Sequence, residues 1–127
     1  MNSFVMNGYL WRVKIVNPNS PMLVDRTNRL RVATTDPKTR IVYLSNYLDR
    51  GFRTRVLIHE LGHCALFSYG LLEMIHRIVP REYWIDAEEW VCNFIADYGM
   101  IIFRSAYHIL GDQALFEVPR AFDKFIA

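Results

Sequence analysis

The sequence predicts an α+β protein in which the strands come first and the helices follow. Three observations support this prediction. Segments rich in β-branched and aromatic residues fill the first third of the chain, the hydrophobic period changes near Asp49, and a long apolar segment follows Trp84. Strand-like composition followed by helical periodicity is typical of the α+β class. Because the chain has 127 residues and is 52% hydrophobic, we expect a single domain, residues 1–127, with one core.

Three segments near the N-terminus have the composition of β-strands. Residues 8–16 end at the turn signal Asn-Pro-Asn-Ser-Pro of residues 17–21. Residues 29–35 and 40–45 flank Asp-Pro-Lys-Thr, a sequence that favours a type I turn, so these two segments should form a hairpin. We therefore expect a small antiparallel sheet at the N-terminus.

The helical part of the sequence begins near Asp49. A first helix is expected to run to about Ser68 and to stop before Gly70, and a short one should cover residues 71–78. A third helix should extend from Trp84 to about Leu110 and end at Gly111, and the tail beyond it is expected to hold a last short helix. Because the third helix is apolar nearly all round, we expect it to be buried, with three large side chains in the core: Trp90, Phe94 and Ile101.

Charge and targeting signals exclude several classes of protein. The chain has 15 basic and 13 acidic residues, a balance that does not favour a nucleic-acid or membrane-surface partner. It shows neither a signal peptide nor an apolar run of about 18 residues, the length that a membrane span needs. We therefore expect a cytoplasmic monomer. The two cysteines, Cys64 and Cys92, are expected to be reduced and buried.

The sequence His-Glu-Leu-Gly-His at residues 59–63 interrupts the apolar first helix with three titratable side chains. Since residues four apart lie on one helical face, His59 and His63 can both reach one metal ion, with Glu60 close enough to act on a bound water. The alternative is a core helix with hydrogen-bonded histidines. That alternative leaves three buried polar groups in need of partners, each costing about 1–3 kcal/mol if unpaired, so a metal site is favoured. Glycine at position 62 suggests that another element approaches the helix closely.

A catalytic metal needs a third protein ligand, and Asp86, Glu88 and Glu89 are the candidates. We choose Glu89, because Asn93 lies one turn later on the same face and can accept a hydrogen bond from His63 outside the ligand shell. Glu88 is instead followed one turn later by Cys92, a poor acceptor. Two alternatives stay open: Asp86 as the ligand, and a thiolate of Cys92 that closes a structural zinc site.

The two motifs together resemble those of the gluzincin metallopeptidases, and most of all the small ImmA/IrrE-type peptidases that are common in phages and mobile elements. The second motif of that family is Glu-x-x-Ala-Asn-x-Phe-Ala. In residues 89–96, Asn93 and Ala96 match it, whereas Cys92 and Ile95 depart from it. In size the chain is also similar to the minigluzincins. The resemblance covers about residues 40–103.

The resemblance implies a zincin-like fold and a zinc metalloendopeptidase. Zn²⁺ would be held by His59, His63 and Glu89, and a zinc-activated water with Glu60 as general base would hydrolyse peptide bonds of a protein or peptide substrate. The segment 40–45 resembles the edge strand along which such enzymes bind peptides. The alternative is a non-catalytic, zinc-containing peptide- or protein-binding module on the same fold. Four residues are weighed as stabilisers of the oxyanion, although a structural role is favoured for each: His76, Tyr83, Tyr107 and His108. The segment 115–127 could cover the site, although a structural last helix is favoured.

Overall fold

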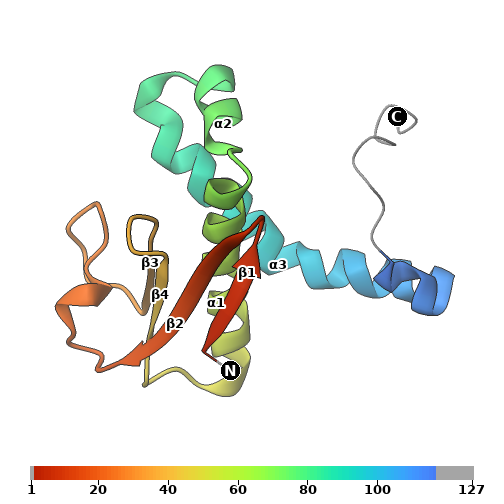
Figure 1. The fold of residues 1–127 in the computed structure, drawn as a ribbon, viewed down its shortest axis with the longest axis horizontal. Helices are drawn as coiled ribbons and strands as arrows, with labels where there is room; N and C mark the ends of the chain where they lie inside the picture. Colours follow the sequence, from red (N-terminus) through yellow and green to blue (C-terminus); the bar gives the residue numbers. More distant parts are fainter. Residues whose placement is uncertain (1, 117–127) are drawn as a thin grey trace. The chain divides into compact units, whose positions relative to one another are not determined.

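The structure, a computed structural model, describes residues 2–116 (Figure 1), and the chain divides into two compact units, Met1–Asp97 and Tyr98–Ala127. The first unit contains strands β1 (Ser3–Met6), β2 (Tyr9–Val16), β3 (Ala33–Asp36) and β4 (Ile41–Ser45) and helices α1 (Arg50–Ser68) and α2 (Leu72–Ile78). Helix α3 (Trp84–Leu110) begins in the first unit and ends in the second. Three short 3-10 helices complete the elements: η1 (Pro21–Leu23), η2 (Arg81–Tyr83) and η3 (Gly111–Leu115). The predicted α+β class and the order of strands before helices are confirmed.

The sheet is mixed, which corrects the antiparallel sheet that we expected. Its strand order is β1-β2-β4-β3, with β2 and β4 parallel and the two outer pairs antiparallel. The predicted hairpin of β3 and β4 is confirmed. However, residues 17–32 carry the chain to the far edge of the sheet before β3 begins, so the hairpin returns β4 into the centre, alongside β2. A crossover of this length is what a parallel pairing requires.

The strand order also changes which strand lies at the edge beside the helices. The segment that we expected at the edge, residues 40–45, corresponds to β4 and is paired on both sides. Strand β3 pairs only with β4 among the described residues, so β3 is the edge strand on that side.

Strand β1 is an element that the sequence analysis did not predict. It pairs with β2 through a tight turn in which Asn7 has φ 48° and Gly8 has φ 80°. Two consecutive residues with positive φ are typical of a type I′ turn, for which Asn-Gly is the preferred sequence. The Asn-Gly sequence at residues 7–8 could therefore have predicted the hairpin of β1 and β2.

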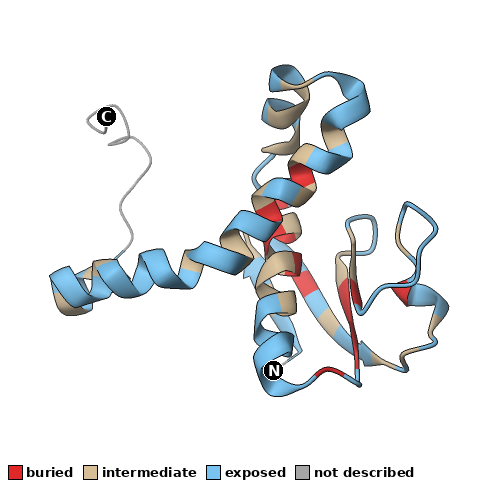
Figure 2. Ribbon diagram, turned by 180° about the vertical axis from the view of Figure 1, so that it is seen from behind, coloured by how far each residue is buried: buried red, intermediate tan, exposed pale blue. Residues whose placement is uncertain are grey.

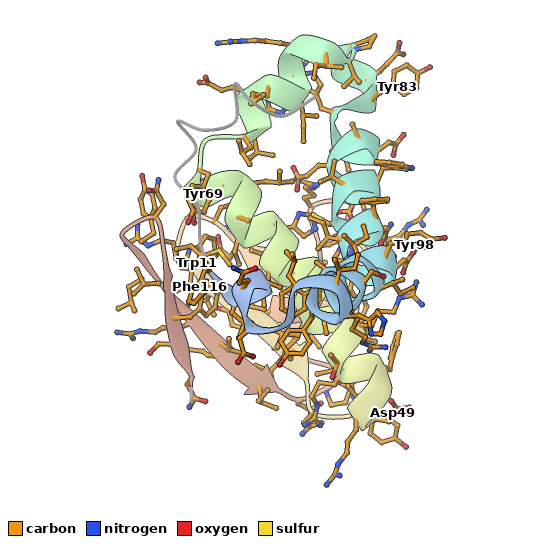
Figure 3. The ribbon with its side chains drawn as sticks, turned by 90° about the vertical axis from the view of Figure 1, so that its right-hand side faces the viewer. Trp11, Asp49, Tyr69, Tyr83, Tyr98 and Phe116 are labelled. Atoms are coloured by element: carbon orange, nitrogen blue, oxygen red, sulfur yellow. The ribbon has the colours of Figure 1, made fainter. Side chains whose placement is uncertain are left out.

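Helix α1 begins and ends where the sequence predicts. Asp49, labelled in Figure 3, accepts a hydrogen bond from the Phe52 backbone N–H at 2.8 Å and so caps the first turn. At the other end, Gly70 has φ 65°, and the Leu71 N–H donates to the Leu66 carbonyl at 2.8 Å. This is a Schellman ending, which satisfies the last carbonyl groups of the helix. The histidine pair therefore lies between two capped ends of α1.

The core lies between the sheet and α1 (Figure 2). Trp11, Val42 and Cys64 are fully buried there. The Trp11 indole N–H donates to the Ser68 hydroxyl at 2.9 Å, and the Asn7 side-chain amide donates to the Ser68 carbonyl at 2.8 Å. These bonds fasten the end of α1 to β2 and to the β1–β2 turn. As expected, the two cysteines are free and buried.

Helix α3 covers the predicted residues but is not the buried helix that we expected. Glu88 and Cys92 are its buried residues. Three residues that we assigned to the core are largely exposed: Trp90 at 67%, Phe94 at 42% and Ile101 at 56%. Apolar residues on every side of a helix indicate that the helix can be buried. They do not indicate how many of its sides are covered by other elements. In the first unit, α3 packs against α1 where Cys92 approaches Gly62.

The second unit contains the end of α3 and η3. Gly111, with φ 62°, ends the helix as predicted, and the Tyr107 hydroxyl donates to Asp112 at 3.0 Å. Most of the segment 115–127 lies outside the described residues, and so do the last short helix expected there and its alternative role as a cover of the site. No helix within residues 2–116 combines the length and the hydrophobicity needed to cross a membrane.

Candidate metal centre

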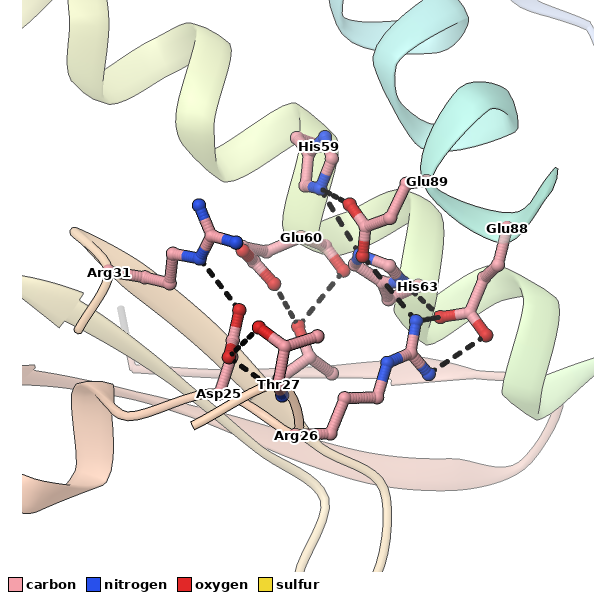
Figure 4. A network of polar contacts seen from close by, with 10 residues as sticks. Asp25, Arg26, Thr27, Arg31, His59, Glu60, His63, Glu88 and Glu89 are labelled. Carbon is pink, nitrogen blue, oxygen red and sulfur yellow. Dashed lines mark hydrogen bonds and ion pairs between the residues drawn. The ribbon is translucent and has the colours of Figure 1, made fainter. Parts of the chain in front are cut away.

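An open cleft of about 1040 Å³ lies in the first unit, between the edge strand and the helices. Strand β3 and the loop that precedes it form one wall, α1 contributes the histidine pair, and the first turns of α3 form the opposite wall (Figure 4). All five residues that the sequence analysis selected for the site line this cleft: His59, Glu60, His63, Glu89 and Asn93.

Two histidines and a glutamate converge in the cleft. The Nε2 atoms of His59 and His63 lie 3.1 Å apart. Glu89 reaches them from α3, with Oε2 at 3.1 Å from Nε2 of His59 and Oε1 at 3.3 Å from Nε2 of His63. Among the described residues, these three side chains form the group of potential ligands whose donor atoms all lie within 4.8 Å of one another.

The donor set fits a small divalent cation. Ligand atoms placed tetrahedrally around an ion at about 2.0–2.1 Å lie about 3.3 Å from one another. The two imidazole nitrogens are 3.1 Å apart, and each lies 3.1–3.3 Å from the nearer oxygen of Glu89. Two imidazole nitrogens and a carboxylate oxygen are typical zinc ligands. Three protein ligands leave a fourth position for water or substrate, as in catalytic rather than structural sites.

The electrostatics of the cleft favour positive charge at the same point. Burial opposes protonation of His63, but its contacts with Cys92, Glu88 and Glu89 raise its pKa to about 12. Hydrogen bonds from His59, which has the larger effect, and from His63 hold the pKa of Glu89 well below its ordinary value. The cluster thus stabilises a proton on His63, and a metal ion would have to displace that proton to bind the ring.

Glu60 follows His59 on α1 and is 7% exposed. Burial raises the pKa of Glu60, and the hydrogen bond that its Oε2 accepts from the Thr35 hydroxyl at 2.5 Å opposes this shift. Because Thr35 belongs to β3, the edge strand holds this carboxylate in a fixed orientation. A buried, oriented carboxylate of raised basicity is suited to proton transfer.

The partner of His63 outside the ligand group is Glu88, in the place where we expected Asn93. Nδ1 of His63 lies 2.6 Å from Oε2 of Glu88, which is 8% exposed. Asn93 is exposed and lines the cleft. Glu88 was passed over as a metal ligand because Cys92, a poor acceptor, follows it one turn later, but Glu88 itself contacts the His63 ring.

Arg26 is a residue of the site that the sequence analysis missed. It belongs to the loop between η1 and β3, and its guanidinium binds both carboxylate oxygens of Glu88 at 2.9 and 3.1 Å. Its Nη2 also lies 3.4 Å from Oε1 of Glu89. Since 62 residues separate Arg26 from Glu88, no local sequence pattern links them.

The alternative ligands occupy other positions. Asp86 lines the cleft but lies outside the group of converging donors. Cys92 contacts His63 but is also outside that group, and its sulfur lies 3.1 Å from the place that a Cβ would take at position 62. The predicted close approach at Gly62 is therefore confirmed, and α3 is the element that approaches.

Two of the residues weighed for oxyanion stabilisation belong to the first unit, and neither lines the cleft. His76 stacks on Trp84 with 3.9 Å between ring centroids, and Tyr83 is 53% exposed. The other two, Tyr107 and His108, belong to the second unit.

None of the protein-family models, curated proteins and solved structures compared with this chain matches it.

Proposed function

We propose that the protein is a zinc-dependent metallopeptidase that hydrolyses peptide bonds of a protein substrate. The observation that carries this proposal is the convergence of His59, His63 and Glu89, with donor atoms 3.1–3.3 Å apart, next to the buried carboxylate of Glu60. The resemblance of residues 59–63 and 89–96 to the gluzincin motifs supports the same activity. Zinc is favoured over harder cations because two of the three donors are imidazole nitrogens.

In this proposal each side chain has a defined task. His59, His63 and Glu89 would hold the zinc, which would supply the Lewis acid that activates a water and polarises the scissile carbonyl group. Glu60 would accept a proton from the water as the water oxygen bonds to the carbonyl carbon, and would deliver that proton to the nitrogen of the leaving amine as the C–N bond breaks. Thr35 keeps Glu60 in place through its short hydrogen bond during both transfers.

The substrate would lie along β3. This strand lines the cleft and has a free edge among the described residues, so an extended peptide can add to the sheet there through main-chain hydrogen bonds. The side chain of Thr35 joins this strand to Glu60, so a peptide on β3 would lie next to the general base. Edge-strand binding was expected for residues 40–45, and the strand order supports β3 in their place.

The test compares the wild-type protein with Glu60→Gln and Glu73→Gln. Glu73 is a matched control because its side chain is a carboxylate on α2 that is 81% exposed. We expect all three proteins, purified without chelator, to contain one zinc each. Only Glu60→Gln should lose peptide cleavage, by at least about 100-fold, in a proteomic screen for new peptide termini.

The other outcomes separate the alternatives. Absence of stoichiometric zinc from the wild-type protein would contradict the proposed centre. Stoichiometric zinc in all three proteins without cleavage by any of them would favour a zinc-containing binding module. Equal cleavage by all three would exclude Glu60 as the general base.

A further inference from the structure

A chain of three side chains connects the loop before β3 to the candidate ligand His63. Arg26 contacts Glu88, and Glu88 contacts His63 (Figure 4). We propose that Arg26 is a positioning residue of the metal centre: it fixes the carboxylate of Glu88, and Glu88 in turn fixes the ring of His63. This inference rests on the proposed zinc site but not on the reaction that the site catalyses.

The first step is the orientation of the His63 ring. Its Nε2 faces His59 and Glu89, whereas its Nδ1 lies 2.6 Å from Oε2 of Glu88. A metal can bind Nε2 only when that atom carries no hydrogen, so the ring proton must be on Nδ1. Glu88 accepts a hydrogen bond from this Nδ1–H, which selects the tautomer and the ring orientation that metal binding needs.

The second step is the orientation of Glu88. Both of its oxygens accept hydrogen bonds from the Arg26 guanidinium, at 3.1 Å to Oε1 and 2.9 Å to Oε2. A bidentate pair fixes the plane of a carboxylate as well as its position. Without Arg26, Oε1 of Glu88 would lose its hydrogen bond from the guanidinium, and the Glu88 side chain could rotate away from His63.

The third step is the rigidity of the loop that carries Arg26. Asp25 holds this loop together by accepting hydrogen bonds from the Thr27 N–H at 2.8 Å, the Arg29 N–H at 3.1 Å and Nε of Arg31 at 2.6 Å. The loop also closes through a bridge between Val24 and Leu30. Arg26 therefore extends from a fixed backbone, so the geometry of its ion pair is set before any metal binds.

The charge of Arg26 gives it a second effect on the centre. Glu88 and Glu89 are neighbours in sequence and both carboxylates face the histidine pair, which brings two negative charges together. Arg26 lies against both of them, with Nη2 2.9 Å from Glu88 and 3.4 Å from Glu89. It offsets their mutual repulsion, which would otherwise push the two side chains apart.

The experiment measures zinc affinity by competition with a chromophoric chelator for the wild-type protein and for Arg26→Gln, Arg26→Lys and Arg29→Gln. Arg29 is the matched control, since it is an exposed arginine of the same loop that also lines the cleft. We expect Arg26→Gln to weaken zinc binding by about 10–100-fold, the usual effect of losing a partner outside the ligand shell. Arg26→Lys should recover part of the loss, because lysine restores the charge but not the bidentate geometry. Arg29→Gln should bind as the wild type does.

A double-mutant cycle separates positioning from a general structural effect. If Arg26 acts through Glu88, then Arg26→Gln combined with Glu88→Gln should weaken zinc binding no more than Glu88→Gln alone. The absorption spectrum of the cobalt-substituted protein should change in the same variants, since it reports the ligand geometry. Circular dichroism verifies that each variant is folded, and if Arg26→Gln is not, then Arg26→Lys against the wild type decides the question.

The outcomes distinguish this inference from the proposed function. Wild-type zinc affinity in both Arg26 variants, or additive losses in the double variant, would overturn the positioning role. A wild-type protein that binds no zinc would overturn both proposals. A wild-type protein that binds zinc but cleaves no peptide would overturn the peptidase proposal alone, and the affinities of the Arg26 variants would still decide the role of Arg26.

Discussion

Replacing Gly62 with alanine should destabilise the protein relative to the same replacement at Gly51. Both glycines belong to α1, Gly51 in its first turn and Gly62 in its interior, and neither has a positive φ. A Cβ at position 62 would lie 3.1 Å from the sulfur of Cys92 and 3.4 Å from its Cα, whereas a Cβ at position 51 would have no atom within 4 Å. Both replacements therefore put alanine in place of a helical glycine, but only the one at position 62 adds a close contact with α3.

The size of the difference follows from these contacts. Alanine is favoured over glycine inside a helix by up to about 1 kcal/mol, and Gly51→Ala, in the first turn, should gain part of that amount. At position 62 the same gain is opposed by overpacking, which costs about 1–3 kcal/mol. The Cys92 side chain cannot swing away easily because it is fully buried. We therefore expect Gly62→Ala to be less stable than Gly51→Ala by about 1–3 kcal/mol.

Urea denaturation of the two variants and the wild type measures this difference directly, and thermal melting should show a gap of several degrees. The zinc affinity of Gly62→Ala should also fall, because a shift of α3 moves Glu89 away from the histidines. If Gly62→Ala is stabilised as much as Gly51→Ala, then α3 does not pack against α1 at Cys92, and the reasoning that brings its carboxylates to the site is refuted.

Three further predictions address the core, the loop and the metal. Ser68→Ala should destabilise the protein by about 1–3 kcal/mol in urea denaturation, because it leaves the buried N–H of Trp11 without a partner; an unchanged stability would contradict the role of this bond. Asp25→Asn should cost about 1 kcal/mol at pH 7. Burial opposes ionisation of Asp25, yet the hydrogen bonds that it accepts hold its pKa below the ordinary value of 3.8. A carboxylate whose pKa is lowered by folding stabilises the fold at pH values above its unfolded pKa. The difference in unfolding free energy between the wild type and Asp25→Asn should therefore shrink as the pH falls below about 4. A difference that does not depend on pH would contradict this role of Asp25. Removing zinc from the loaded protein should lower the free energy of unfolding by about 4 kcal/mol at a free zinc concentration of 1,000 times Kd, but should leave His59→Ala unchanged; equal responses would argue against binding at this residue.

Features encoded by neighbouring residues were predictable from the sequence. The ends of α1 follow from the cap residue Asp49 and from Gly70. The position of His59 and His63 on one face of the helix follows from the helical repeat alone. The hairpin of β3 and β4 follows in the same way from its turn sequence. In each case the deciding interactions span a few residues, so the sequence pattern contains them.

Features that depend on distant contacts were not predictable. The position of β4 in the centre of the sheet depends on the path of residues 17–32, which lead the chain to the far edge of the sheet. The sequence of β4 itself does not indicate that path. The burial of α3 depends on how much of its apolar surface finds a partner, which explains why Trp90 is exposed. Arg26 lies in a polar loop without a recognisable motif, and its role follows only from its contact with Glu88 on α3.

The contact between Gly62 and Cys92 explains why two adjacent carboxylates serve the same pair of histidines. Cys92 follows Glu89 by three residues and Glu88 by four, so all three lie on one face of α3. When Cys92 rests on Gly62, both carboxylates are brought beside the histidines, and the difference of about 100° between them directs Glu89 to the Nε2 atoms and Glu88 to Nδ1 of His63. Our choice of Asn93 assumed that a ligand and an outer acceptor are spaced by one full turn. Adjacent residues can supply both when the ring between them presents its two nitrogens in different directions, so the glycine between the two histidines is as much a determinant of the site as the residues on either side of it.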